Sequence, residues 1–266
     1  MRTLPFALAL SCTAAFAQLG RPATPEPVWT PTFTVGIESF GPTLTGHFQG
    51  IQNGQPISLD LDSDLGLSRD KTTPGFFMDY QGPRFGFQLS TGSAEYRGDR
   101  ILTRDITLNG TTYPATDRVQ SHVKLVSVDG TWTIKLVSSQ EAFLGLDLGA
   151  QVWKLDMDAH DLPTPPLTAS AASTSVSAPI PQIGLSGGAK GFGDRLEAKA
   201  YVHYLGYKSA KYTRTGFDVR LFPVKWLGLR AFYEDGSFDV PKGSIKDDLE
   251  LQLDRKGGGF GVMVRF

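Results

Sequence analysis

The end of the chain alternates between large apolar residues and small, flexible or charged ones. The apolar members of this alternation are Phe260, Val262, Val264 and Phe266. Because successive side chains of a β-strand point to opposite faces, a period of two places all four on one face. The other face carries Gly261, Met263 and Arg265. We therefore expect a closing β-strand with one apolar surface and one mixed, more polar surface.

This segment resembles the C-terminal assembly signal of bacterial outer-membrane proteins, which ends in Phe and has apolar residues at alternate positions. The resemblance implies a transmembrane β-barrel in the bacterial outer membrane, with lipid outside and a polar lumen inside. It also implies two kinds of partner: outer-membrane lipid with lipopolysaccharide, and the barrel-assembly machinery that would bind the C-terminal strand. A soluble β-sandwich or a lipocalin-like barrel also alternates, and it stays open as the competing interpretation.

The first 17 residues have the three parts of a secretory signal peptide. A basic start at Arg2 is followed by an apolar run over 4–10, and 15–17 supply the small residues that a signal peptidase reads. We predict cleavage after Ala17, a periplasmic segment over 18–30 and a barrel over 31–266. The single cysteine, Cys12, lies in the part to be removed, so the mature chain would contain no disulfide. Acylation of Cys12, as in a lipoprotein, is the alternative, but the residues before it form a poor acylation signal.

The composition fits an all-β chain and argues against a nucleic-acid-binding domain. The 26 basic and 27 acidic residues almost cancel, whereas binding of nucleic acid normally requires a clear basic excess. No sustained helical spacing of apolar residues occurs, and no helical membrane span follows the signal peptide. The 30 glycines and the repeated alternating segments favour strands.

Alternating segments recur along the chain, and their connections are of two kinds. Short turns fall near 81–83, 137–140, 191–194 and 222–225, while long polar links cover about 51–72, 98–117, 158–177 and 239–249. Short turns on one side and long loops on the other are typical of outer-membrane barrels. We predict an antiparallel up-and-down barrel of about ten strands, with eight or twelve remaining open. The apolar parity changes near 129–130, which predicts a bulge, and again at 257–259, which predicts a bulge or a kink.

The faces opposite the apolar ones carry charges of both signs. If the apolar faces contact lipid, these charges must fill the lumen, where they are costly unless they are paired. Acids and bases are nearly balanced, which favours a narrow or charge-plugged lumen over an open ion-selective pore. The predicted lumen residues are Glu38, Asp79, Lys124, Asp147, Glu197, Lys199, His203, Asp218, Arg220, Arg230, Glu234 and Arg265. The favoured function is non-enzymatic, either a structural role in the envelope or the passage of small solutes.

Two short motifs on the predicted loops contain the candidate catalytic groups. Asp60 and Asp62 form an Asp-x-Asp pair, and Asp158 and His160 form an Asp-x-His pair. They resemble the pairs of the omptins, ten-stranded outer-membrane proteases in which such pairs face each other across the barrel mouth. The resemblance implies an alternative function as a surface hydrolase, in which the Asp-His couple would activate a water. The simpler interpretation is that these four side chains are solvated loop residues. We therefore assign no catalytic residue.

The first of these motifs also has the alternate spacing of oxygen ligands in a calcium loop, since Asp64 follows Asp60 and Asp62. The EF-hand pattern requires glycine at its sixth position, where this chain has Leu65. We therefore predict no metal site and no cofactor.

Overall fold

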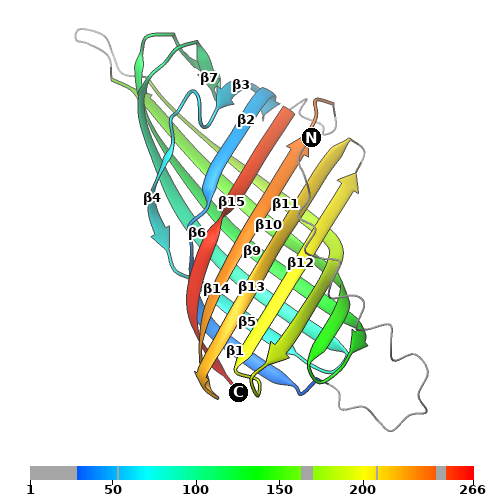
Figure 1. Ribbon diagram of the computed structural model, residues 1–266. Coiled ribbons are helices and arrows are strands. Elements are labelled where there is room, and N and C mark those ends of the chain that lie inside the picture. Colours follow the sequence, from blue (N-terminus) through cyan, green and yellow to red (C-terminus); the bar gives the residue numbers. More distant parts are fainter. Residues whose placement is uncertain (1–28, 53, 163–169, 208, 244–249) are drawn as a thin grey trace.

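The computed structural model describes residues 29–52, 54–162, 170–207, 209–243 and 250–266, and these are mostly β-strand (Figure 1). In this described part of the chain, no helix is long and apolar enough to cross a membrane. The strands are β1 (Thr32–Phe40), β2 (Thr43–Gln52), β3 (Gln55–Asp60), β4 (Ser68–Thr73), β5 (Gly75–Gln81), β6 (Phe85–Ile101), β7 (Ile106–Leu108), β8 (Thr111–Tyr113), β9 (Arg118–Ser138), β10 (Ala142–Asp161), β11 (Ala171–Gly191), β12 (Leu196–Tyr207), β13 (Ala210–Val224), β14 (Leu227–Val240) and β15 (Glu250–Arg265).

Ten of these strands form a closed ring. Their order around it is β1-β5-β6-β9-β10-β11-β12-β13-β14-β15, and β15 pairs with β1 to close it. All ten pairings are antiparallel. Closure leaves the ring without the free edges that an open sheet exposes. The prediction of an all-β, antiparallel up-and-down barrel of about ten strands is confirmed.

The other five strands extend the wall at the end opposite the short turns, which we call the loop end. The first ring strand stops at Gly41-Pro42, and β2 then takes its place beside β15. β3 pairs with β2, β4 pairs with β6, and the β7–β8 hairpin joins β3. At the other side of this hairpin, the Tyr113 hydroxyl donates a 2.9 Å hydrogen bond to the Ala159 carbonyl of β10. The hairpin therefore connects β3 with β10 across the loop end.

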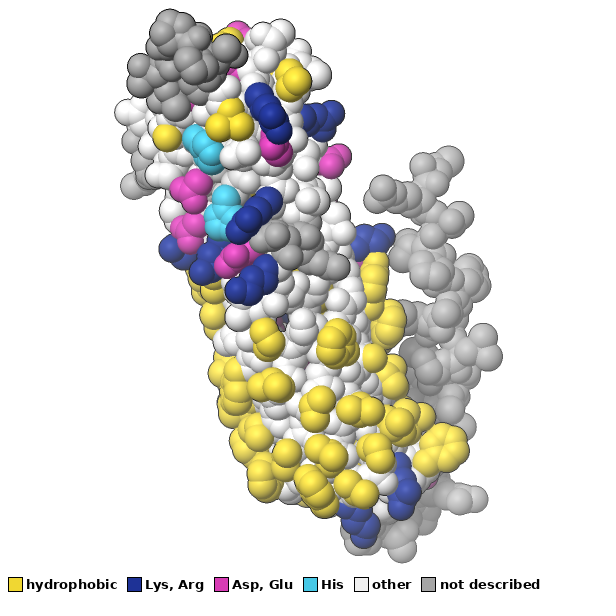
Figure 2. All heavy atoms as spheres, turned by 90° about the vertical axis from the view of Figure 1, so that its left-hand side faces the viewer, with side chains coloured by type: hydrophobic (Ala, Val, Ile, Leu, Met, Phe, Trp, Pro, Cys, Tyr) yellow, Lys and Arg dark blue, Asp and Glu magenta, His cyan; other side chains and the backbone are white. Residues whose placement is uncertain are grey.

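The outside of the barrel near the short turns is apolar (Figure 2). Large exposed hydrophobic side chains occur here on all ten ring strands, and we call this band the belt. Its members include Phe33, Ile37, Phe76, Tyr80, Phe85, Val128, Trp132, Leu136, Leu144, Leu148, Val152, Ile183, Leu185, Val202, Tyr204, Phe217, Val219, Leu221, Leu229, Phe260 and Val262. A soluble barrel would bury such a band, whereas a membrane barrel turns it towards lipid. We call the part of the barrel at this height the membrane tier.

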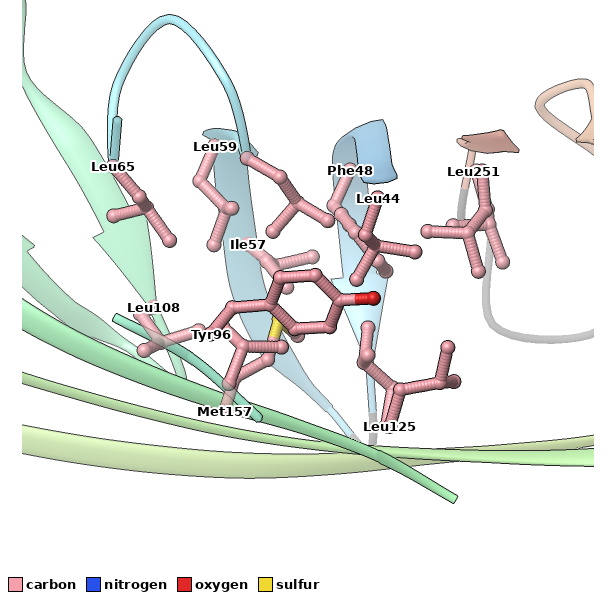
Figure 3. Close-up of a cluster of buried hydrophobic side chains, with 14 of the residues drawn as sticks. Leu44, Phe48, Ile57, Leu59, Leu65, Tyr96, Leu108, Leu125, Met157 and Leu251 are labelled. Carbon is pink, nitrogen blue, oxygen red and sulfur yellow. The ribbon is translucent and has the colours of Figure 1, made fainter. Parts of the chain in front are cut away.

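Beyond the belt, towards the loop end, the polarity of the wall is reversed, and we call this part the upper tier. Its inward side chains are apolar and form one core, in which Phe48, Tyr96 and Met157 are at most 2% exposed (Figure 3). The Tyr96 hydroxyl donates a 2.9 Å hydrogen bond to the Pro42 carbonyl, so this buried polar atom is satisfied. The upper tier therefore has the apolar interior of a soluble barrel, while the membrane tier has a polar interior.

The two parity changes in the sequence mark the boundary between these tiers. β9 pairs with β10 in continuous register through 129–130, and β15 pairs with β14 in continuous register through 257–259. Odd-numbered residues face inward along both strands, and only the polarity of that inward face changes. The two predicted bulges are therefore wrong. A register shift between β9 and β10 lies instead beside a short turn, at Leu144/Gly145.

The glycines of the 257–259 run make room for neighbouring chain segments. A Cβ atom on Gly259 would lie 2.3 Å from the Phe232 ring, and one on Gly257 would lie 2.8 Å from the Gly41 carbonyl oxygen. The Phe232 ring also packs against Phe40 of β1, with centroids 5.5 Å apart. Glycine at these inward positions thus lets an aromatic pair fill the lumen where β1 ends.

Candidate functional site: the sealed lumen

Charged side chains fill the membrane tier of the lumen and pair with one another. Arg220 of β13 lies 2.7 Å from Asp79 of β5 and 3.1 Å from Asp218 of its own strand. Arg230 of β14 lies 2.7 Å from the other oxygen of Asp218 and also forms an ion pair with Glu38 of β1. All five side chains are at most 7% exposed. This cluster therefore joins four strands from inside the barrel.

A second cluster lies further along β13, towards the loop end. Arg214 forms an ion pair with Asp129 of β9 and lies 2.5 Å from Glu234 of β14. Glu234 also pairs with Arg255 of β15, whose guanidinium carbon lies 4.9 Å from the centroid of the Trp153 ring. Because Trp153 belongs to the apolar core, Arg255 stands where the charged part of the lumen ends.

A histidine and a carboxylate form a third buried pair. Nε2 of His203 on β12 lies 2.9 Å from Asp147 of β10, which also accepts hydrogen bonds from Thr133 at 2.6 Å and Ser186 at 2.8 Å. Serine, histidine and aspartate are the residue types of a nucleophilic triad, in which the histidine contacts the serine hydroxyl. Here Asp147 lies between the other two, so this arrangement does not provide a base for Ser186.

The lumen is closed at the short-turn end by Trp29, which precedes β1. Trp29 is 3% exposed and packs edge-on against Phe143 of β10, with ring centroids 5.2 Å apart. The ammonium nitrogens of Lys135 and Lys190 lie 4.3 Å and 4.0 Å from the centroid of its ring. Two cation–π contacts therefore hold the indole inside the barrel base.

Two small cavities lie between these side chains. One cavity of about 20 Å³ lies against Trp29, Gln81 and Arg220, and another of about 10 Å³ lies against Asp129 and His203. A single water needs roughly 10–15 Å³ measured in this way. Each cavity therefore has room for about one water molecule and not for a larger solute.

The structure places the predicted lumen residues inside the barrel, with one exception. Lys124 lies exposed on the outside of β9 in the upper tier, so its assignment to the lumen is wrong. The cause is the reversal of polarity: above the belt the charged face is the outer one. Lys199, which is partly buried, contacts both cavities and donates to Gln88 across the lumen at 3.4 Å. Arg265 lies 2.6 Å from Glu197.

The prediction omitted several residues that complete the clusters. They are Asp129, Lys135, Lys190, Arg214 and Arg255. Asp129 and Arg255 lie next to the expected bulges, where the inward parity was assumed to change. Keeping one parity along each strand would have assigned both to the lumen.

The first candidate catalytic pair lies at the end of β3, where Asp60 is the last residue of the strand and Asp62 lies in the turn that follows. The Asp60 carboxylate accepts the backbone N–H groups of Asp62 at 2.9 Å and Ser63 at 2.7 Å. Burial raises the pKa of Asp60, but the hydrogen bonds from Ser63 and Asp62 outweigh it and hold this pKa below its ordinary value. Asp64 accepts the Asp60 N–H at 2.8 Å and pairs with Arg104. The carboxylates of Asp60 and Asp64 thus stabilise a turn. Across the described residues, no three His, Cys, Asp or Glu side chains are grouped to hold a metal ion.

The second candidate pair lies on the outer face of β10. Asp158 and His160 are exposed, and their contacts are His122 at 3.8 Å and Gln120 at 3.1 Å respectively. The intervening residue of β10, Ala159, faces the apolar core, as does Leu59 of β3. The core therefore separates the two candidate pairs, and among the described residues the structure does not bring them together. Figure 3 shows this core, with Leu59 of β3 and Met157 of β10 among its labelled side chains.

Comparison with known proteins relates this closed barrel to a structural class. No protein-family model matches the chain, and no curated protein matches its sequence. Its structure is similar to the outer membrane protease OmpT from Escherichia coli, with a TM-score of 0.58 and 11% identity over 88% of this chain and 97% of that chain. The fold is that of a bacterial outer-membrane β-barrel. At this identity the similarity concerns the fold and not the activity.

Two further solved structures align along most of the chain with lower scores. The translocator domain of the autotransporter NalP from Neisseria meningitidis aligns with a TM-score of 0.36 and 10% identity, over 97% of this chain and 94% of that chain. The P. putida toluene transporter TodX aligns with a TM-score of 0.30 and 9% identity, over 89% of each chain.

Proposed function

We propose that this protein is a closed structural barrel of the bacterial outer membrane, exported by a cleaved signal peptide. In that membrane the short turns face the periplasm and the upper tier faces the outside, as in other barrels of this kind. Its partners are then outer-membrane lipid and lipopolysaccharide. During assembly, its C-terminal strand, with Phe260, Val262, Val264 and Phe266 on the outward face, binds the barrel-assembly machinery.

The observation that carries this proposal is the bridging of the lumen by buried ion pairs. Arg220 reaches from β13 to Asp79 of β5, and Arg214 reaches from β13 to Asp129 of β9. Removing either partner would leave a buried charge unpaired, which is strongly unfavourable. An ion or solute that crossed the lumen would have to separate these pairs and then pass the apolar core above them. The closed state therefore favours a structural role over the passage of small solutes.

We further propose that the role is not enzymatic. The carboxylate of Asp60 accepts two backbone N–H groups, Asp62 is exposed in the turn, and the second pair lies on the outside of the wall. A water-activating Asp-His couple needs its substrate and its partner groups within hydrogen-bonding reach. The observed contacts favour turn and surface roles for all four residues.

Single-channel recording of the refolded protein in planar lipid bilayers tests the closed barrel. We expect no conductance steps from protein whose insertion is verified by protection of the membrane tier from added protease. Liposome swelling with small sugars is expected to be no faster than with empty liposomes. Reproducible conductance steps or sugar-dependent swelling would instead establish small-solute passage and overturn the structural role.

A further inference from the structure

Cations outnumber carboxylates inside the membrane tier. The ion-pair cluster of Arg220 and Arg230 contains two cations and three carboxylates, and that of Arg214 and Arg255 contains two of each. The remaining inward charges among the described residues are two carboxylates, Asp147 and Glu197, and four cations, Lys135, Lys190, Lys199 and Arg265. With His203 neutral, these inward side chains together carry one net positive charge.

Positive charge collects at the short-turn end of the lumen, beside Trp29. Glu197 is shared there by two cations, at 2.6 Å from Arg265 and 3.8 Å from Lys190. Lys135 has no such partner, because its ammonium nitrogen is buried and makes no hydrogen bond within the described part of the chain. A buried ammonium without a matching negative charge is unfavourable. The observed contacts therefore leave the charge of Lys135 unmatched.

The larger of the two cavities lies at the same place. Its volume is about 20 Å³, somewhat more than the roughly 10–15 Å³ that one water needs. Trp29, Phe143, Lys199 and Arg220 are among the side chains that line it. The Lys135 ammonium lies 4.3 Å and 4.5 Å from the centroids of the Trp29 and Phe143 rings. The indole N–H of Trp29 is buried, and no described residue accepts it. Cations and an unused donor thus surround a space for one small particle.

Two carboxylates also line this cavity, and both are already paired. Asp218 contacts both arginines of its cluster, and Glu197 lies 2.6 Å from Arg265. Their charges are therefore matched by cations other than Lys135. A water in the cavity could accept the Trp29 N–H, but it would leave the charge of Lys135 unmatched. A monatomic anion is little larger than water and would satisfy both groups.

We propose that the cavity beside Trp29 binds a single halide ion such as chloride. Lys135, Lys190 and Lys199 attract the ion, and the indole N–H of Trp29 supplies a donor. The bound ion matches the net positive charge of the lumen and reduces the repulsion between the two ammonium groups that contact the Trp29 ring. It therefore stabilises the closed base of the barrel. The small volume of the cavity excludes polyatomic anions such as phosphate.

The first test measures how chloride affects stability. Wild type, Lys135→Met and the matched control Lys225→Met are refolded in detergent and unfolded with urea at several chloride concentrations, with sodium gluconate keeping the ionic strength constant. Lys225 is an exposed lysine in a short turn at the same end of the barrel. For wild type and Lys225→Met, we expect the unfolding equilibrium constant to fall roughly tenfold for each tenfold rise in chloride above its dissociation constant. For Lys135→Met, we expect no change with chloride.

The second test locates the ion in wild type, so it remains decisive if Lys135→Met does not fold. In crystals grown in sodium bromide, we expect an anomalous-scattering peak in the cavity lined by Trp29 and Lys199. Peaks confined to exposed lysines would show an adventitious ion only and would overturn the proposal. So would equal chloride dependence in Lys135→Met and wild type. A stability of wild type that does not depend on chloride would mean that the cavity holds water or that Lys135 is neutral, and it would overturn the proposal as well.

Discussion

Arg214 on β13 and Asp129 on β9 form an ion pair across the lumen, although three strands separate them around the ring. The two side chains are 6% and 5% exposed, and Arg214 also lies 2.5 Å from Glu234. Replacing Arg214 by Ala leaves two buried carboxylates without this cation, and breaking a buried pair in this way costs about 3–5 kcal/mol. We expect a loss of that size in the free energy of unfolding, measured by urea titration of the refolded protein.

Lys256→Ala is the control for this measurement. Lys256 pairs with Asp235 at 3.5 Å, but both side chains are well exposed on the outside of the barrel. Solvated ion pairs contribute little to stability, so the urea midpoint should stay close to that of wild type. If Arg214→Ala and Lys256→Ala have the same midpoint, the lumen pair does not hold the barrel together.

Trp29→Ala tests whether the residue before β1 seals the base of the lumen. The substitution removes a buried ring that contacts Phe143, Lys135 and Lys190, and truncation of a buried aromatic side chain costs about 3–5 kcal/mol. We expect a lower urea midpoint and faster quenching of the remaining tryptophan fluorescence by acrylamide. Trp226→Ala serves for comparison, because Trp226 lies on a short turn and is 59% exposed. A Trp29→Ala protein as stable as Trp226→Ala would exclude the seal.

The ring of strands could be predicted from the sequence, but the apolar interior of the upper tier could not. Alternation with a period of two, short turns and the C-terminal pattern all depend on local geometry, which a single sequence records directly. The reversal of polarity depends on what surrounds the wall. The inward residue Leu125 and the outward residue Val128 are both apolar, and nothing local distinguishes a core from a lipid as their environment. A bulge and a membrane boundary therefore produce the same change of apolar parity in the sequence. For this reason Lys124 was wrongly assigned to the lumen.

Which lumen charges pair with each other could also not be predicted from the sequence. That Asp79 and Arg220 face inward follows from parity, but that they meet at 2.7 Å depends on the register of strands far apart in the chain. The candidate catalytic pairs show the opposite case. Their spacing within each motif was visible, whereas their separation by the apolar core required the positions of β3 and β10.

We predict that the stability contributed by Tyr113 in the β7–β8 hairpin decreases at high pH. Burial, together with the nearby charge of Asp161, raises the pKa of Tyr113 to about 12 from 10.0. A raised pKa means that the folded state favours the neutral phenol, which donates to the Ala159 carbonyl. The stabilisation from Tyr113 is therefore fully present below pH 10 and is lost as the pH rises through about 12.

Absorbance at 295 nm, which reports phenolate, measures this directly as the difference between wild type and Tyr113→Phe. The difference should titrate near pH 12 in the folded protein and near pH 10 in concentrated urea, where the tyrosine is solvated. The same midpoint under both conditions would mean that the Tyr113 side chain is not buried between the β7–β8 hairpin and β10.

The position of the belt predicts that substitution by arginine has different consequences at two outward positions of one strand. Leu148 and Asp158 both face outward on β10, but Leu148 lies in the belt and Asp158 lies in the upper tier. Leu148→Arg should lower the free energy of unfolding in phospholipid vesicles by about 2–4 kcal/mol, the cost of a lipid-facing arginine near the bilayer centre. Asp158→Arg should leave that free energy nearly unchanged, because its side chain remains in water. Refolding both variants in vesicles and titrating them with guanidinium chloride provides the measurement. Similar stabilities for the two variants would place the bilayer elsewhere on the barrel, because the cost for Leu148→Arg arises only if lipid surrounds that position.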